Sequence, residues 1–143
     1  MNGQMAYLIG MILGNGEIQR DNTSTTITID IPYKKLQDDS NLDVSIYVAA
    51  SLVDIRSNIE PLIGRELIVT QGIHSTKLSF TKHNEEYTIR EIYRFIGNGI
   101  HHRNMTMNTE LFNISVDEKK ELLRGIADVT GYIRKSNIAF GQI

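Results

Sequence analysis

The stretch LIGMILGNGEI, from Leu8 to Ile18, begins like an apolar helix but is interrupted by Gly10, Gly14 and Gly16. A glycine inside a helix costs about 1 kcal/mol relative to alanine. Gly10 and Gly14 are four residues apart and therefore share one face of the helix. Small residues on one face let a second helix approach closely, backbone against backbone. The stretch thus predicts a helix over residues 5–13 that packs on another helix and ends by Gly16.

A second stretch, LRGIADVTGYIRK from Leu123, aligns with LIGMILGNGEIQR without gaps. The alignment places Gly10 on Gly125 and Gly16 on Gly131, and both segments lead from a predicted helix into a predicted strand. We therefore expect the two helices to pack together about a pseudo-two-fold axis, through Gly10, Gly14 and Gly125. In the alternative interpretation, Gly14 only terminates the helix and Gly10 is a tolerated defect.

The rest of the chain predicts an α+β fold, an antiparallel sheet with helices on one face. Residues 25–31 alternate between apolar and polar side chains, which is typical of a half-buried strand. Ser115 and Glu118 form a capping box that opens the last helix. The predicted helices cover residues 5–13, 42–63, 87–96 and 115–129, with a short one over 107–112. The predicted strands cover 17–20, 25–31, 66–70 and 77–82, and residues 132–143 form a further strand or hairpin arm.

Composition indicates one globular domain, and the absence of cysteine fits a reducing compartment without establishing one. The chain has 143 residues, of which 41% are hydrophobic and 22% charged, and it contains no cysteine. A disulfide framework, a thiol nucleophile and a cysteine metal site are therefore excluded. No segment reaches the ~18 apolar residues of a membrane helix, so we expect an intracellular protein, cytoplasmic or organellar. The formal charge of -2 does not favour nucleic-acid binding, although local charge distribution matters more than the sum.

The two glycine motifs resemble those of the LAGLIDADG homing endonucleases. The matching residues run from Leu8 to Gly16 and, less closely, from Leu123 to Gly131. The family's repeat order is helix, two strands, helix, two strands, helix, which is also the order predicted for residues 5–98. The resemblance covers one full repeat, residues 1–114, and the opening of a second, residues 115–143. It implies that the motif helices pair at the centre of a saddle of antiparallel strands over the DNA major groove.

The resemblance also implies an acid at the penultimate motif position of each helix, where divalent metals bind and activate water. Here those two catalytic positions hold Asn15 and Thr130, which carry no charge. The remaining catalytic candidates are Asp128, which a two-residue shift turns by about 200° around the helix, and Glu17, which already lies in the strand. We therefore expect a cleavage-deficient protein. We predict no metal site, and Mg²⁺ would be the cofactor only if the chain were active.

The strands offer candidate DNA contacts on the face opposite the apolar residues, where Glu17, Gln19 and Asp21 would also lie. Lysines and arginines at strand ends are suited to phosphate contacts, and strand threonines to contacts with bases or phosphates. His101, His102 and Arg103 are interpreted as a solvent-exposed loop. The candidate DNA-binding residues are Gln19, Arg20, Thr26, Thr28, Lys34, Lys35, Lys77, Ser79, Thr81, Lys82, Tyr132, Arg134 and Lys135.

The main hypothesis is a duplex-DNA-binding module derived from a LAGLIDADG endonuclease that has lost cleavage. Its alternatives are an active Mg²⁺-dependent, site-specific endonuclease and a protein-interaction domain of a larger enzyme. Because the second repeat stops after about one strand, two interpretations stay open. The chain is a piece of a larger protein, such as an intron-borne or intein-borne nuclease, or its last helix and strand complete the fold or pair with a second copy.

Overall fold

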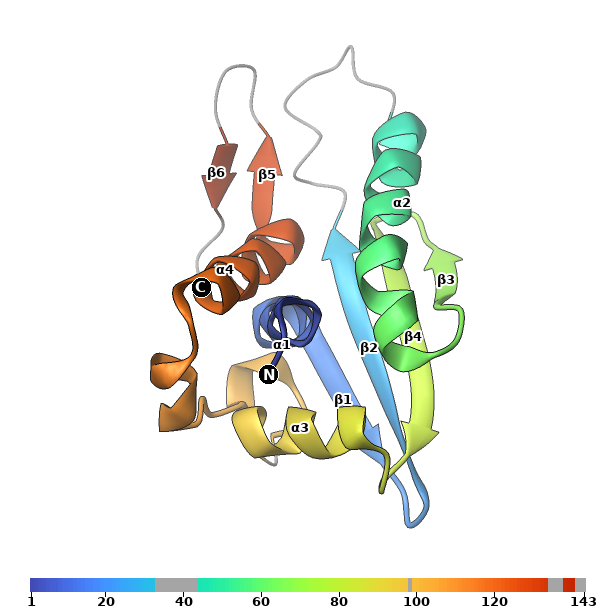
Figure 1. Ribbon diagram of the computed structural model, residues 1–143. Coiled ribbons are helices and arrows are strands. Elements are labelled where there is room, and N and C mark those ends of the chain that lie inside the picture. The colour runs from blue at the N-terminus through green and yellow to red at the C-terminus, as the bar shows by residue number, and fades with distance from the viewer. Residues whose placement is uncertain (33–43, 98, 134–137, 141–143) are drawn as a thin grey trace.

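The structure is a computed structural model that describes residues 1–32, 44–97, 99–133 and 138–140 (Figure 1). Its element order confirms the predicted α+β class and the helix, two strands, helix, two strands, helix order of the first part. The helices are α1 (Gly3–Asn15), α2 (Val44–Ile63), α3 (Tyr87–Ile96) and α4 (Val116–Thr130), with 3-10 helices η2 (His102–Asn104) and η3 (Thr109–Asn113). The strands are β1 (Gly16–Arg20), β2 (Ser24–Pro32), β3 (Ile68–Gln71), β4 (Ser75–His83), β5 (Gly131–Ile133) and β6 (Ile138–Phe140).

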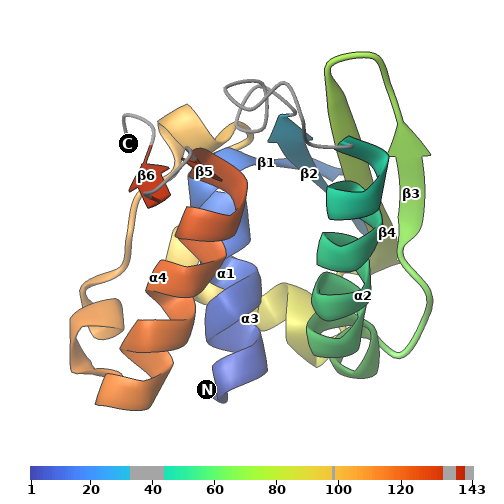
Figure 2. The ribbon, with the colours of Figure 1, turned by 90° about the horizontal axis from the view of Figure 1, so that it is seen from above.

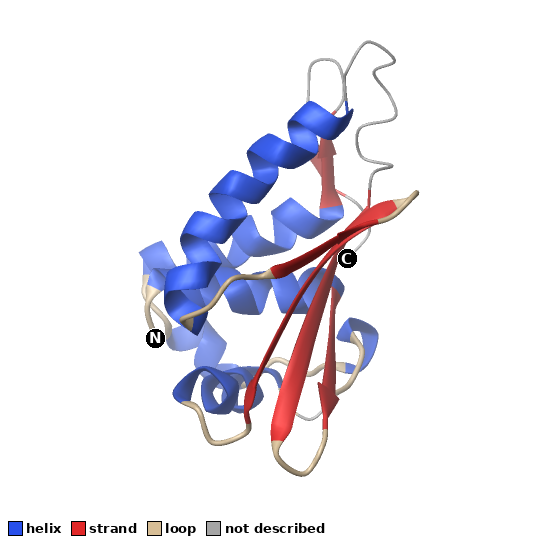
Figure 3. Ribbon diagram, turned by 90° about the vertical axis from the view of Figure 1, so that its right-hand side faces the viewer, coloured by secondary structure: helices blue, strands red, loops and turns tan. Residues whose placement is uncertain are grey.

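Strands β1 to β4 form one antiparallel sheet in the order β1-β2-β4-β3. The register places Ile27 between Ile18 and Phe80, and all three side chains are buried. The helices lie on this apolar side of the sheet (Figure 3). Among the described residues, no helix covers the opposite side, which we call the open face. Strands β5 and β6 pair with each other as a separate hairpin.

Helix α1 packs against α4 through backbone contacts at two glycines, as the sequence predicted. A Cβ atom added to Gly10 would lie 2.1 Å from the carbonyl oxygen of Leu122, and one added to Gly125 would lie 2.2 Å from that of Tyr7. The shift along the chain that aligns Gly10 with Gly125 also aligns Tyr7 with Leu122. The two contacts are therefore related by a pseudo-two-fold axis, as expected. The alternative in which Gly10 is a tolerated defect is wrong, because no side chain fits there.

The two paired helices differ on the sides that face away from each other. Helix α1 is central and lies between α4 and α2 (Figure 2), and its residues from Met5 to Ile12 are all buried. In α4 the buried residues are Leu122, Gly125 and Val129. Leu8 is fully buried, whereas its aligned counterpart Leu123 is 63% exposed. The internal repeat is thus symmetric in the backbone contacts of the helix pair and asymmetric on the outer sides of the two helices.

Two caps fix the ends of these helices. The predicted capping box is confirmed, because the Glu118 amide donates to Ser115 Oγ at 3.1 Å and the Ser115 amide donates to Glu118 Oε1 at 2.9 Å. The Asn2 side chain accepts from the Met5 amide at 2.8 Å and caps α1. Both caps satisfy backbone donors that a helix start leaves without partners.

Candidate nucleic-acid interface

Polar side chains from three neighbouring strands form rows across the open face. The register places Thr28 between Glu17 and Ser79, and Thr26 between Gln19 and Thr81. The hydroxyl groups of Thr26 and Thr81 lie 2.8 Å apart and share a hydrogen bond. In the next row, Asp30 lies opposite Lys77. The structure therefore brings six of the predicted DNA-binding residues onto one face: Gln19, Thr26, Thr28, Lys77, Ser79 and Thr81.

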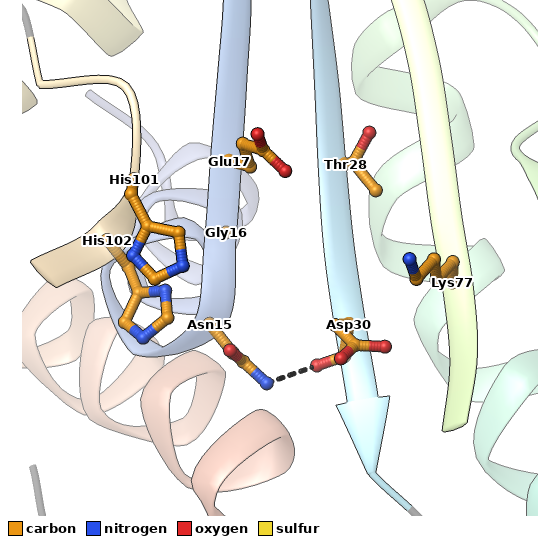
Figure 4. Close-up of a pocket in the computed structure, with 8 residues that line it drawn as sticks. All are labelled: Asn15, Gly16, Glu17, Thr28, Asp30, Lys77, His101 and His102. Atoms are coloured by element: carbon orange, nitrogen blue, oxygen red, sulfur yellow. Dashed lines mark hydrogen bonds between the residues drawn. The ribbon is translucent and has the colours of Figure 1, made fainter. Parts of the chain in front are cut away.

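A pocket of about 120 Å³ lies on this face where α1 ends and β1 begins (Figure 4). At its edge, the Asn15 side chain donates to the Asp30 backbone oxygen at 2.8 Å. This bond ties the end of α1 to β2 and gives the asparagine a structural role. The pocket is lined by Asn15, Gly16, Glu17, Thr28, Asp30, Lys77, His101 and His102.

The two histidines reach the pocket because their segment pairs with the edge of β1. The Ile18 amide donates to the Ile100 carbonyl oxygen at 2.7 Å, and His101 forms a bridge with Glu17. Both histidines are half-buried, so the interpretation of a solvent-exposed loop is wrong for them and right for Arg103. A bridge of this kind joins residues far apart in sequence and leaves no periodic signal in a short segment.

The electrostatics of the pocket are mixed. Burial, followed by the nearby charge of His101, lowers the pKa of His102 below its ordinary value and favours the neutral imidazole. The rings of His101 and His102 lie with their centroids 4.1 Å apart. The Oδ1 atom of Asp30 is buried without a hydrogen-bond partner. Sequence reasoning missed Asp30 as a site residue, although its alternation with buried isoleucines placed it on the open face.

Of the four catalytic candidates, only two line the pocket. Asn15 and Glu17 line the pocket. Thr130 donates its hydroxyl to the Ile126 carbonyl oxygen of its own helix at 2.7 Å. Asp128 accepts a hydrogen bond from the Tyr7 hydroxyl at 2.5 Å and so belongs to the α1–α4 interface. Within the described residues, no three histidine, aspartate or glutamate side chains are placed to hold a metal ion.

Two predicted DNA-binding residues lie on the helix side of the sheet instead of the open face. Lys82 donates its ammonium to the Ile63 carbonyl oxygen at 2.5 Å, where α2 ends, and lies 3.5 Å from Glu86. The guanidinium of Arg20 lies 4.8 Å from the centre of the Tyr93 ring. Each is the strand neighbour of an open-face residue, and successive side chains in a strand point to opposite faces. This correction removes two cations from the predicted surface.

The other predicted contacts are not placed on either face. Lys34, Lys35, Arg134 and Lys135 lie outside the described residues. Tyr132 belongs to β5, which pairs with β6.

Comparison with models of known protein families finds no match for this sequence, and a search of the curated proteins finds none either. No helix in the described part combines the length and the apolar character that crossing a membrane requires. The functional interpretation therefore depends on the residues of the open face and of the helix pair.

Proposed function

We propose that the open face binds duplex DNA and that the chain is a cleavage-deficient module resembling the LAGLIDADG endonucleases. The observation that supports this most strongly is the pair of cross-strand rows Glu17–Thr28–Ser79 and Gln19–Thr26–Thr81. Side chains of this kind hydrogen-bond to base edges and phosphates, and the major groove admits an antiparallel pair of strands. The order of helices and strands along the chain and the glycine-mediated helix pair support the same resemblance.

The composition of the face favours contacts with bases over contacts with phosphates. Lys77 is its one exposed lysine among the described residues, and Glu17 and Asp30 lie beside it. Carboxylates repel phosphates but accept hydrogen bonds from the amino group of cytosine. The phosphate contacts would come in addition from the cationic candidates predicted at a strand end, Lys34 and Lys35, and on the strand after the second motif, Arg134 and Lys135.

The residues at the ends of the two motif helices do not fit the Mg²⁺ ions that the resemblance implies. Mg²⁺ prefers carboxylate oxygens in a near-octahedral arrangement. Asn15 and Thr130 supply no carboxylate, and the amide nitrogen of Asn15 and the hydroxyl of Thr130 donate structural hydrogen bonds to backbone oxygens. Asp128 is engaged with Tyr7. This donor set is the basis for proposing binding without cleavage.

A protein-binding surface is the second candidate, and exposed apolar residues at one edge favour it. Ile68 on β3 is 63% exposed, and Ile73 in the turn before β4 is 90% exposed. Such residues are common in protein interfaces, but a pair of them is a small patch. DNA remains the better proposal because the polar rows are larger and regular.

The test is fluorescence anisotropy with a labelled random-sequence duplex. Thr81→Glu adds a negative charge to the middle of the open face, and Ser57→Glu adds the same charge to an exposed position on α2. We expect Thr81→Glu to weaken binding at least fivefold and Ser57→Glu to leave it unchanged. Equal effects of the two variants, or no binding by the unmodified chain, would contradict the proposal.

A further inference from the structure

The α1–α4 interface is symmetric in its backbone contacts. A Cβ on Gly10 would meet Leu122 and Ile126, and a Cβ on Gly125 would meet Tyr7 and Met11. The alignment of the two helices relates these contacts, because it places Tyr7 on Leu122 and Met11 on Ile126. By these contacts alone, α1 would pair as well with the α1 of a second copy as with α4.

One polar pair breaks this symmetry. The Tyr7 hydroxyl donates to Asp128 Oδ2 at 2.5 Å, and the whole Tyr7 side chain is buried. The aligned positions on the other side of the pseudo-two-fold axis hold Leu122 and Leu13. The interface is thus polar on one side of the axis and apolar on the other.

Arg124 completes the polar side. Its guanidinium lies 4.3 Å from the centre of the Tyr7 ring and forms ion pairs with Glu121 and with Asp54 of α2. The position aligned with Arg124 in α1 holds Ile9, which is fully buried. Asp128 accepts the hydrogen bond of the Tyr7 hydroxyl, and Arg124 lies over the Tyr7 ring. Both belong to α4, and the aligned positions of α1 hold no such groups.

These differences decide which helices fit together. In a symmetric pair of two α1 helices, each Tyr7 would face a Leu13 and its buried hydroxyl would have no acceptor. In a pair of two α4 helices, each Asp128 would face a Leu122. A buried polar group without a partner is costly, and single polar residues at helix interfaces are known to select the partner helix.

We propose that Tyr7 and Asp128 select α4 as the partner of the glycine face of α1 and disfavour self-association of the chain through α1. The kind of partner that fits this face is a helix with a glycine at the position that Gly125 takes in α4 and an acid at the position of Asp128. The inference is independent of DNA binding, because it concerns the helix pair alone.

The chain contains no cysteine, so one introduced cysteine can report on pairing. Asn15→Cys places it near the pseudo-two-fold axis. The aligned residue Thr130 has its Cγ2 atom 3.3 Å from a Cβ added to Gly14, so the ends of the two helices lie close together there. Two α1 helices that pair would bring the two cysteines together and form a disulfide-linked dimer under oxidising conditions. The dimer fraction is measured on non-reducing gels over a range of protein concentrations, with light scattering as a second readout.

The variants to compare are Asp128→Leu, Tyr7→Phe and Val129→Ala, each in the Asn15→Cys background. Val129→Ala loosens the same interface but keeps the polar pair, so it controls for a merely weaker interface. We expect half of the protein to become dimeric at a concentration about tenfold lower in Asp128→Leu and in Tyr7→Phe than in Val129→Ala. Where Asp128→Leu does not fold, Tyr7→Phe decides the question. Equal dimer fractions in all three variants, or dimer in the Asn15→Cys parent at the same level, would overturn the proposal.

Discussion

The carbonyl oxygen of Leu122 lies 2.1 Å from the position that a Cβ atom would take on Gly10. That oxygen belongs to the backbone of α4, and the amide nitrogen of Ile126 on the same helix lies 3.1 Å from the same position. Real Cβ atoms do not approach a backbone oxygen this closely. The close approach of α4 therefore requires glycine at this position. The packing that it allows outweighs the cost of a glycine within α1.

Substitution of Gly10 will separate the two helices. Gly10→Leu is expected to cost a few kcal/mol of unfolding free energy, because overpacking against backbone cannot be relieved by a side-chain movement. Urea denaturation followed by circular dichroism measures this cost. The control is Gly3→Ala in the same helix, whose Cβ would lie 3.4 Å from a flexible Glu121 side chain and should leave stability within about 0.5 kcal/mol. Stability of the Gly10→Leu protein close to that of the unmodified chain would refute the backbone-contact account.

This helix pair was predictable from sequence because its signal is local and repeated. The motif occurs twice, and its glycines align between the two copies. This alignment, together with the apolar run in the first copy, predicted which helix faces meet. The strand pattern of residues 25–31 was equally informative, since Ile27, Ile29 and Ile31 alternate with polar side chains. The Tyr7–Asp128 pair could not be predicted, because their hydrogen bond depends on how the two helices cross.

The buried Tyr7 hydroxyl will make stability depend on high pH. Burial, followed by the hydrogen bond to Asp128, raises the pKa of Tyr7 well above its ordinary value. A group whose pKa is raised in the folded state stabilises the fold below the unfolded pKa, about 10 for tyrosine, and loses this contribution as pH rises above it. We therefore expect the unfolding free energy to fall with pH above about pH 10 more steeply in the unmodified chain than in Tyr7→Phe. Parallel pH profiles from urea titrations would show that Tyr7 does not contribute.

Lys77 is expected to contact a phosphate at the edge of the open face. Lys77→Gln should weaken binding to all duplex sequences alike and reduce the slope of log affinity against log salt by about one. Lys120→Gln is the matched control, because Lys120 is an exposed lysine on α4, away from the sheet. Anisotropy titrations at several salt concentrations give both slopes. If the two substitutions change the slope equally, Lys77 has no special position in the complex.

Restoring an acid at the end of α1 tests how far the motif has degenerated. Asn15→Asp removes the hydrogen bond to the Asp30 carbonyl oxygen and adds a carboxylate to a pocket that already holds Glu17 and Asp30. We expect a loss of about 1–3 kcal/mol without divalent metal and partial recovery in Mg²⁺, which binds carboxylate oxygens. Thermal unfolding with EDTA or Mg²⁺ measures both effects. Asn15→Ala is the control, and recovery of the two variants by the same amount would contradict the prediction.

The candidate site was harder to predict than the helix pair because it is assembled from distant segments. Alternation along β2 and β4 correctly placed Thr26, Thr28, Ser79 and Thr81 on one face. Lys82 and Arg20 were assigned by their charge and position near strand ends, whereas the pleat turns both toward the helices. The pocket also includes His101 and His102, which reach it through a single backbone bridge to β1. A bridge of this length in sequence has no periodic pattern by which it could be predicted.

DNA binding by the open face is tested most directly by selection from a random-sequence duplex library in a gel-shift assay, with and without Mg²⁺ and at several salt concentrations. We expect retarded, uncut DNA that is enriched for particular sequences, with affinity falling log-linearly with salt. Cut DNA in Mg²⁺ would contradict the assignment of Asn15 and Thr130 as non-catalytic. The absence of retained DNA at every salt concentration would show that the open face does not bind duplex DNA and would leave it as a surface for a protein partner.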